Sequence, residues 1–388
     1  SCEAWLKDLA LSLRPKADAL QRLDRAKAAL DQAVAKVFPG AEPHLYGSAV
    51  SGFGNPGSDI DCVVKLGGCD VELLKEKGIE RENPPSRASG YAAARALGKA
   101  LKSAELEALG LTTKEVVDAR VPLLKCESAE GVDIDVTFDN TLPIHNSALL
   151  RAYAGLDDRV ADLGRIVKYW AKRRRLNDVL EGTLSSYSWV ILVIHYLQHI
   201  KLLPNLQEAA CLKDKGAPLP QPRAEYGNEE LLDGMHDVWF LDPQRVAPDG
   251  PELSAWVDGA PEDASLHGLL AGFFRYFAYE WNAYAKVVSI RHSNGWVAKR
   301  VYFHQVHQAE AAAKASGAAL EVDEGIEEGP VDDEGSDEVQ KSSGASDKPG
   351  DHRLPKEEHH IQHRIASRQV LCIDDPMELG RVLGASFR

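Results

Sequence analysis

Apolar residues recur every three or four positions in the first forty residues, which is the spacing of one face of a helix. The recurring positions are Leu20, Leu23, Leu30, Val34 and Val37. They predict helical structure over residues 3–37, interrupted before Pro15 and ended at Pro39-Gly40. Similar patterns predict further helices over 91–109, 148–154, 157–175, 186–201 and 266–286.

Runs of β-forming residues bounded by turn residues predict strands in the first half of the chain. Residues 44–66 have the pattern strand, glycine-rich turn, strand, and two more strands are expected near 116–125 and 132–138. Because the second half is mainly helical, the pattern predicts an α+β protein with two domains joined near residue 147. Residues 204–265 look irregular, residues 314–350 are expected to form a flexible loop, and order is expected to return at 368–383.

Composition narrows the class of protein without identifying it. The 388 residues are 44% hydrophobic and 27% charged, and no apolar run approaches the roughly 20 residues that span a bilayer. The six cysteines form no CxxC pair, which argues against a cysteine zinc site and for a reducing compartment. We expect a mitochondrial or cytoplasmic protein that is neither secreted nor bound to a membrane.

The distribution of charge bears on nucleic acid as a partner. The formal net charge is −14, but residues 321–340 hold ten acids and no base, so the rest of the chain carries only −4. That remainder includes the basic run Lys172-Arg173-Arg174-Arg175. The balance predicts no strong non-specific grip on nucleic acid and leaves room for a local basic site.

The segment after Tyr46 carries the most informative chemistry. Gly47 follows a short strand and Ser48 opens a helix-like turn, so that backbone N–H groups can approach a phosphate closely. Asp59 and Asp61 lie two apart on a strand and share one face, where they repel each other unless a cation lies between them. Such oxygen ligands suit Mg²⁺ or Mn²⁺. The alternative is a surface turn with solvated acids.

A third acid on a neighbouring strand would complete a site for two metal ions. The candidates are Asp133 and Asp135 in the strand 132–138, and alternation alone does not choose between them because both share a face. A site of this kind serves the in-line attack of a hydroxyl group on phosphorus, in which one ion activates the nucleophile and the other holds the triphosphate.

The glycine turn and the acids together resemble the signature of a known superfamily. Residues 47–61, GSAVSGFGNPGSDID, are similar to the DNA-polymerase-β-like nucleotidyltransferases. Later stretches resemble the template-independent RNA terminal nucleotidyltransferases, and they lie at 132–150, 166–178, 182–198, 269–281 and 373–383. The greatest likeness is to minimal terminal uridylyltransferases (TUTases) of the trypanosomal kind, including the minor editosome-associated type.

The resemblance implies an architecture. It predicts a polymerase-β-like mixed-sheet catalytic domain over 39–147 and a mainly helical, poly(A)-polymerase-associated domain over 148–388, with a cleft between them. The helices within 1–38 are expected to pack on the C-terminal domain, and the flexible acidic loop falls at about 314–350.

The resemblance also implies roles for single residues. The acid before the family's F-x-N is its third metal ligand, which favours Asp135 over Asp133, so that Asp59, Asp61 and Asp135 are expected to hold two Mg²⁺ or Mn²⁺ ions. The matching nucleotide contacts, in addition to Gly47 and Ser48, are Asn146 for the ribose, Lys168 and Lys172 for the triphosphate, Ser186 for a phosphate and Tyr187 for the base.

Base choice is expected to depend on an acid pair near the C-terminus. Asp375 and Glu378 match acids that read uracil through water, and Arg120 matches a basic residue near the nucleotide and the RNA 3′ end. Arg381 stands where some uridylyltransferases have a histidine, which leaves open how ATP is rejected. Each of these residues also has an ordinary structural interpretation: a helix cap for Asn146, a solvated helix face for the lysines, a core position for Tyr187, a surface turn for the acid pair, and a simple strand position for Arg120.

The expected activity is therefore transfer of UMP from UTP to an RNA 3′-hydroxyl group with release of pyrophosphate. The expected partners are UTP, an RNA 3′ end and a protein complex of RNA processing, and the chain is expected to be a monomer. One alternative is a poly(A) polymerase of the same superfamily. Another is a catalytically silent subunit that binds RNA as a scaffold, although three convergent carboxylates argue against it.

Overall fold

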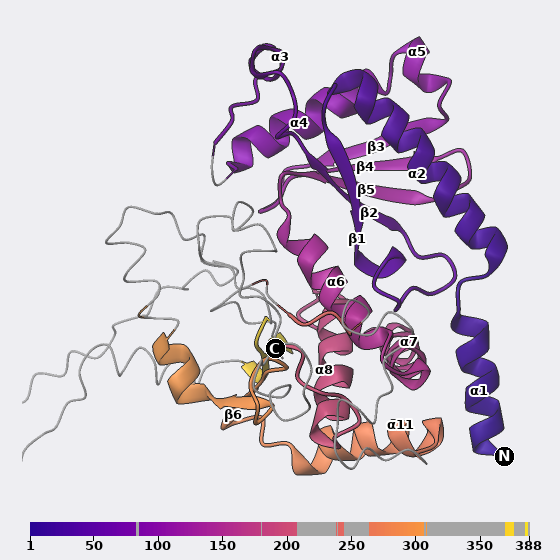
Figure 1. Cartoon of the computed structure of the whole chain (residues 1–388), viewed down its shortest axis with the longest axis vertical. Helices are drawn as coiled ribbons and strands as arrows, with labels where there is room; N and C mark the ends of the chain where they lie inside the picture. The colour runs from indigo at the N-terminus through magenta and orange to yellow at the C-terminus, as the bar shows by residue number, and fades with distance from the viewer. Residues whose placement is uncertain are drawn as a thin grey trace, which may run out of the picture.

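The structure is a computed structural model that describes residues 1–82, 85–179, 181–207, 238, 240–243, 264–305, 308, 369–375 and 385–386. A sheet with helices on it forms the upper part of the molecule in Figure 1, and a group of helices lies below it. In the described residues, no helix combines the length and the apolar character needed to cross a membrane. The predicted acidic loop at 314–350 and most of the predicted irregular region at 204–265 lie outside the described residues.

The described elements alternate in the first half of the chain and are mainly helical in the second. The helices are α1 (Cys2–Leu13), α2 (Ala17–Val37), α3 (Val71–Glu76), α4 (Arg87–Ala100), α5 (Ala104–Glu107), α6 (Leu142–Ala154), α7 (Asp158–Arg173), α8 (Ser186–His199), α11 (Leu266–Arg275), the 3₁₀ turn η1 (Gly47–Ala49) and the π-helical turn η6 (Tyr276–Glu280). The strands are β1 (Glu42–Tyr46), β2 (Ile60–Lys65), β3 (Leu111–Val117), β4 (Leu123–Ser128), β5 (Asp133–Phe138), β6 (Lys286–Val288), β7 (Trp296–Ala298), β8 (Gln369–Ile373) and β9 (Ala385–Ser386).

The main sheet is mixed, as the resemblance implies, and has five strands, one more than the sequence pattern predicts. Its strand order is β1-β2-β5-β4-β3, in which β2 and β5 are parallel and the other neighbours are antiparallel. Helices α2 and α4 contact it, and their buried residues, such as Leu30 and Leu97, join Ile60 and Ile134 in one apolar cluster. Strands β2 and β5 lie side by side within this sheet.

The two N-terminal helices divide between the two parts of the molecule. Leu6, Ala10 and Leu13 of α1 belong to the apolar cluster of the helical part, and α1 contacts α7 and α11. In contrast, α2 packs on the main sheet, as Figure 1 shows. The expected packing against the C-terminal half is therefore seen for α1, while α2 departs from it because its apolar stripe is buried against the sheet.

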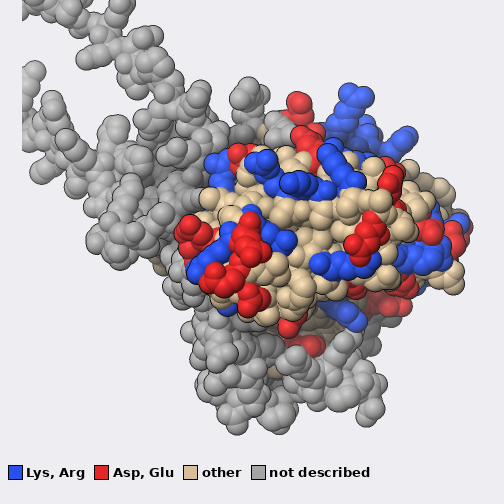
Figure 2. All heavy atoms as spheres, turned by 90° about the horizontal axis from the view of Figure 1, so that it is seen from above, with Lys and Arg blue, Asp and Glu red and all other residues tan. Residues whose placement is uncertain are grey.

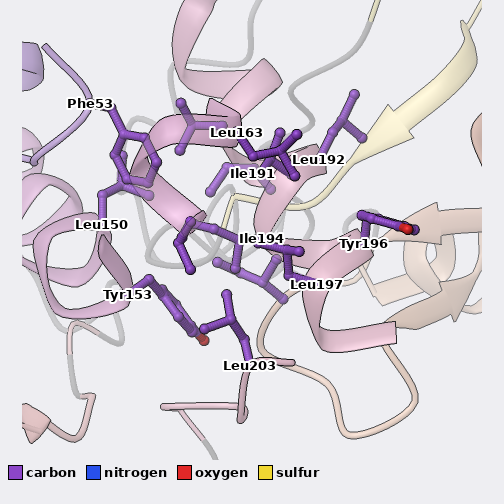
Figure 3. Close-up of a cluster of buried hydrophobic side chains, with 14 of the residues drawn as sticks. Phe53, Leu150, Tyr153, Leu163, Ile191, Leu192, Ile194, Tyr196, Leu197 and Leu203 are labelled. Atoms are coloured by element: carbon purple, nitrogen blue, oxygen red, sulfur yellow. The ribbon is translucent and has the colours of Figure 1, made fainter. Parts of the chain in front are cut away.

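The helical part is built around α8. Nine of its residues are buried, and they pack against α6, α7 and α11. Figure 3 shows Leu150 and Tyr153 of α6 and Leu163 of α7 beside the apolar side chains of α8, together with Phe53. Since Phe53 comes from the loop before β2, this core also fixes a segment of the sheet domain.

Several expected boundaries differ from those in the structure. The strand expected at 116–125 is two antiparallel strands, β3 and β4, with Pro122 between them. The helix expected at 266–286 ends at Glu280, and residues 286–288 instead form β6 of a second sheet with the order β7-β6-β8-β9. This sheet brings β8, near the C-terminus, beside β6 in a parallel pair.

Candidate active site

The register of the central strands places two of the predicted acids next to each other. Asp61 of β2 pairs with Asp135 of β5 in the parallel ladder, and their partly buried side chains therefore share one face of the sheet. Asp59 lies immediately before β2, two residues from Asp61 on the same face. The sequence-predicted triad thus occupies neighbouring positions on adjacent strands.

The electrostatics of these acids show that the site is short of positive charge. Burial, together with repulsion from Asp135 and Asp59, raises the pKa of Asp61 to about 7. Burial and the charges of Asp133 and Asp135 also raise the pKa of Asp59, against the opposing effect of Lys172. Clustered carboxylates with raised pKa values are the donor set that a hard divalent cation would neutralise, so these residues fit Mg²⁺ or Mn²⁺.

Two lysines distinguish Asp135 from Asp133. Lys125 of β4 lies opposite Asp135 and donates to both of its carboxylate oxygens, at 3.2 and 2.9 Å. Asp133 is exposed and accepts a hydrogen bond from Lys114. In the described part of the chain, no three acidic, histidine or cysteine side chains already converge as a metal cage. A metal at the triad would therefore have to compete with Lys125 for Asp135.

The turn before the acids requires glycine at one position. Gly47 has a φ of 71°, and a Cβ atom there would lie 2.2 Å from the Oδ2 atom of Asp61. Its N–H group donates to the Oγ atom of Ser147 at 2.7 Å, which ties the turn to α6. The next residue, Ser48, lies within the 3₁₀ turn η1 rather than opening a longer helix. Gly47 is thus the residue that allows the carboxylate of Asp61 to pack against the turn.

The loop between η1 and β2 is held by α7. Arg165 donates to the carbonyl oxygens of Gly52 at 2.6 Å and Gly54 at 3.1 Å, and Lys168 donates to that of Phe53 at 2.8 Å. The Phe53 ring packs so closely on Gly164 that a Cβ atom there would lie 2.5 Å from it. Helix α7 is therefore fixed against the loop that leads to the acids.

The two predicted phosphate-binding lysines differ in environment. Burial and the neighbouring charges of Arg165 and Lys172 lower the pKa of Lys168 to about 8, although Asp61 opposes this effect. Lys172, one turn further along α7, is exposed. Both remain on the face of α7 from which Lys168 reaches the loop, since residues four apart lie on the same side of a helix.

Asn146 is not a helix cap. Helix α6 begins at Leu142 with Thr141 as its N-cap, which places Asn146 inside the helix. The Oδ1 atom of Asn146 is buried and accepts no hydrogen bond from the described residues. A buried acceptor of this kind costs about 1–3 kcal/mol until it finds a donor, and a ligand hydroxyl group could supply one.

The remaining predicted contacts lie at element ends. Ser186 and Tyr187 are the first two residues of α8, where Ser185 is the N-cap and where the N-terminus of the helix favours an anion. Tyr187 is partly buried and packs against the helical core, so the core interpretation holds for part of its ring. Arg120 is exposed between β3 and β4.

Asp375 is almost completely buried just after β8. The preceding residue, Asp374, is anchored by its backbone N–H group to the carbonyl oxygen of Val288 at 2.8 Å and by Ser289, whose hydroxyl group donates to Oδ2 at 2.9 Å. A surface turn is therefore wrong for Asp375. Glu378 and Arg381 lie outside the described residues.

Sequence reasoning missed the residues that position this site. Lys125 contacts Asp135 and Ser147 contacts Gly47, while Arg165 holds the loop before β2 and Asp374 anchors the chain immediately before Asp375. Arg165 and Asp374 carried a signal, because Arg165 lies three residues before Lys168 on the same helix and Asp374 directly precedes Asp375. The partners of the others depend on strand register and tertiary packing.

A mixed sheet that carries acids on adjacent strands beside a lysine-bearing helix has the residue types that nucleotidyl transfer requires. Residues 3–155 match the family model described as "Poly(A) RNA polymerase, mitochondrial-like, central palm domain". The chain is 32% identical over 287 residues to terminal uridylyltransferase cid1 of Schizosaccharomyces pombe, covering 71% of this chain and 58% of that protein. It is 31% identical over 292 residues to the poly(A) RNA polymerase GLD2 of Danio rerio, covering 73% and 50%.

Solved structures agree with the fold. A structure of the Cid1 poly(U) polymerase bound to Mg 3′-dATP matches with a TM-score of 0.59 and 28% identity over 77% of this chain and 80% of that one. A cytoplasmic RNA terminal U-transferase matches with a TM-score of 0.63 over 100% and 87%, and at 24% identity it supports the fold alone. The α+β fold with a palm domain is thereby confirmed.

The matches support placing the chain among the MTPAP-like, Cid1 and GLD2 nucleotidyltransferases, whose members include poly(U) and poly(A) polymerases. The chain spans between a half and three fifths of the length of these two curated relatives. The matches do not test the trypanosomal, editosome-associated type, which stays a prediction.

Proposed function

We propose that the chain is a template-independent RNA 3′-terminal uridylyltransferase that adds UMP from UTP to an RNA 3′-hydroxyl group. The observation that carries the proposal is the pairing of Asp61 with Asp135 on adjacent strands, with Asp59 beside them. Lys168 of α7 adds to it, because its side chain binds the loop that leads into β2. The name of the cid1 relative supports this activity for a protein of similar sequence.

In this reaction the 3′-hydroxyl oxygen attacks the α-phosphorus of UTP, the bond to the bridging oxygen breaks, and pyrophosphate leaves. Asp59, Asp61 and Asp135 would hold two Mg²⁺ or Mn²⁺ ions, and these ions would lower the pKa of the hydroxyl group, so that it loses its proton, and would neutralise charge on the leaving pyrophosphate. Lys168 and Lys172 neutralise the triphosphate, with the α8 N-terminus at Ser186 as a further anion contact. The buried oxygen of Asn146 is suited to accept a hydrogen bond from a ribose hydroxyl group.

Base choice would depend on Asp375 and Glu378. Uracil offers an N3–H donor where adenine offers the N1 acceptor, so carboxylates on that edge favour uracil. Stacking on Tyr187 adds affinity but little selectivity, because every base has a π-face. The burial of Asp375 and the anchoring of its neighbour Asp374 support a fixed rather than a mobile recognition group.

The first experiment is extension of a labelled 15-nucleotide RNA by the purified chain with Mg²⁺ or Mn²⁺ and each NTP separately. A ladder with UTP alone supports the proposal. A ladder with ATP keeps the metal site and contradicts the base assignment. No ladder with any NTP contradicts the enzymatic assignment for this chain and favours a silent RNA-binding subunit.

Glu378→Ala tests the base assignment directly. It should relax the preference for UTP over CTP and ATP in the same assay, while Glu378→Gln should do so less because it keeps an acceptor. Glu181→Ala, at an exposed acid between α7 and α8, is the matched control. An unchanged ratio of UTP to ATP incorporation in Glu378→Ala would remove this residue from base recognition.

A poly(A) polymerase is the second candidate function. The GLD2 match is nearly as high in identity as the cid1 match and covers a similar share of the chain. Arg381 adds to this alternative because it stands where some uridylyltransferases have a histidine. We also propose that the chain works within a protein complex of RNA processing.

A further inference from the structure

An apolar groove lies on the helical part, away from the acids. Residues of α1, α7 and α11 line it, and its volume is about 510 Å³. These three helices lie at the lower right of Figure 1. Its floor is apolar and includes Leu6 and Ile166, and its outer end carries Arg173 and Arg174. The volume is in the range of pockets that bury a small ligand, which is about 300–1,000 Å³.

The groove is preformed because α1 is tied down at both ends. The carboxylate of Glu3 accepts hydrogen bonds from the N–H groups of Leu266 at 3.3 Å and His267 at 2.8 Å, at the start of α11. At the other end of α1, Arg14 donates to both oxygens of Asp162 on α7, at 3.1 and 2.7 Å. These contacts fix α1 against α7 and α11, so the binding of a ligand would require little loss of conformational entropy in the site.

The groove exposes the residue types that are enriched at protein interfaces. Trp5 is 62% exposed and Tyr169 is 38% exposed, although both are large aromatic residues. Arg173 and Arg174 are exposed and form no ion pair with any residue that the structure describes. Aromatic residues and arginine are the common anchors of binding surfaces.

The groove and the nucleotide site use opposite sides of α7. Lys168 points to the loop before β2, while the groove is lined by Tyr169, Trp170 and Arg173. Positions one, two and five residues after Lys168 lie about 100–200° around the helix from it, given 3.6 residues per turn. An occupant of the groove would therefore leave the nucleotide face of α7 open.

We propose that this groove binds a short acidic peptide segment of a partner protein, with a bulky apolar side chain in the groove and Asp or Glu on Arg173 and Arg174. Charge complementarity favours acidic residues in the peptide, because Arg173 and Arg174 line the groove and no Asp or Glu does. An apolar floor suits a Trp, Phe or Leu side chain. It does not suit an RNA backbone, which needs cations spaced along its path.

The test uses the full chain and a displayed library of random 16-residue peptides, with counter-selection on Trp5→Ala. We expect enrichment of peptides that combine acids with Trp, Phe or Leu. Synthetic copies labelled with fluorescein should bind in the micromolar range by polarisation. Trp5→Ala and Arg173→Glu/Arg174→Glu should each weaken binding at least about tenfold, as loss of an interface anchor does.

Matched controls separate the groove from the helices that form it. Leu11→Ala changes an exposed apolar residue of the same helix α1 outside the groove, and Arg175→Glu changes the next arginine. Both should leave peptide affinity within about twofold, and thermal melting should show that every variant folds. Enrichment of neutral or basic peptides, or of peptides indifferent to both groove variants, would overturn the proposal. Absence of groove-dependent binders would do the same.

Two further outcomes would assign the surface to another occupant. Displacement of the peptides by a 15-nucleotide oligo(U) would favour RNA and contradict the peptide assignment. Self-association of the wild-type chain that Trp5→Ala abolishes, measured by light scattering, would favour a second copy of this chain. Neither measurement depends on catalytic activity, so the outcome is independent of the proposed transferase function.

Discussion

At the scale of single residues, the choice between Asp135 and Asp133 rests on strand register. Asp135 lies opposite Asp61 and is held by Lys125, whereas Asp133 is exposed and bound to Lys114. Asp135→Asn should therefore lower the rate of RNA extension by at least about 10²–10³-fold, because it removes a ligand of the ions that would activate the hydroxyl group and stabilise the leaving pyrophosphate. Single-turnover extension at saturating UTP measures this effect.

Asp133→Asn is the matched control for that variant. It should change the rate by less than about threefold and cost at most about 1 kcal/mol, since it removes only an exposed ion pair. Equal losses in both variants, or a larger loss in Asp133→Asn, would transfer the metal-binding role to Asp133.

The depressed pKa of Lys168 predicts a pH dependence of UTP use. Its pKa is about 8, and the charged form binds the triphosphate, so kcat/KM for UTP should fall about tenfold for each pH unit above 8. Lys168→Arg keeps its charge throughout this range and should flatten the alkaline limb. Initial rates between pH 7 and 9.5 measure this pH dependence. An equal fall of kcat/KM above pH 8 in the wild type and in Lys168→Arg would show that another group titrates.

The sequence predicts which residue types carry the chemistry better than it predicts how they are held. Asp59, Asp61 and Gly47 follow from spacing alone, because two-residue alternation and a turn before a strand are local properties. Lys125 does not, because its contact with Asp135 depends on the pairing of β4 with β5. The cap interpretation of Asn146 fails for a local reason, because α6 already begins at Leu142, where Thr141 and Pro143 are a sequence signal for a helix start.

At the scale of elements, the contact of α7 with the loop before β2 links the two parts of the molecule. Arg165 binds the carbonyl oxygens of Gly52 and Gly54 and also Asp162. Arg165→Met should leave these acceptors without their donor, which costs about 1–3 kcal/mol of unfolding free energy and loosens the approach to Asp59. Thermal melting and the KM for UTP should both change.

Arg151→Met provides the comparison for the loop contact. Arg151 is an exposed arginine near the end of α6, so its loss should move neither the melting temperature nor the KM appreciably. Equal behaviour of the two variants would show that the arginine at 165 does not hold the loop.

Long amphipathic helices were predictable, while short strands and tertiary boundaries were not. The break at Pro15 and the ends of α7 and α8 agree with the sequence pattern within a few residues. Strands β6 and β7 have three residues each, which is too short for a periodic signal, and they exist because β8 pairs with β6 from far along the chain. Burial of Asp375 follows from that pairing.

At the scale of the whole molecule, two apolar cores are joined around α7 and the loop before β2. Phe53 belongs to the helical core although it lies only seven residues before Ile60 of the sheet core. The change from mixed to mainly helical elements along the chain predicts two domains, but it does not predict that α1 and α2 belong to different cores. Both helices carry an apolar stripe, with Leu6, Ala10 and Leu13 buried in α1 and Leu30, Ala33 and Val34 buried in α2, so the presence of a stripe does not decide which core each helix joins.

The distribution of charged side chains over the surface bears on how the protein binds RNA. Basic and acidic side chains are interspersed over the face seen in Figure 2, without a broad surface of one sign. Because the chain outside residues 321–340 also carries a net charge of only −4, we expect few phosphate contacts. The affinity for single-stranded RNA should fall with salt with a logarithmic slope no steeper than about −2, the value for three phosphate contacts.

The ten acids of residues 321–340 should weaken RNA binding through charge alone. Replacing them with Asn and Gln should tighten RNA binding at 50 mM salt, and the difference should vanish by about 300 mM, where screening acts within a few ångströms. A control that exchanges Asp with Glu throughout the segment keeps the charge and should bind as the wild type does. Tighter binding that persists at high salt, or that also occurs in the exchanged control, would mean that the segment affects RNA binding through direct contacts rather than through long-range electrostatic repulsion. Polarisation of a labelled 15-nucleotide RNA across that salt range distinguishes these cases, because only a long-range charge effect is lost as the ionic strength rises.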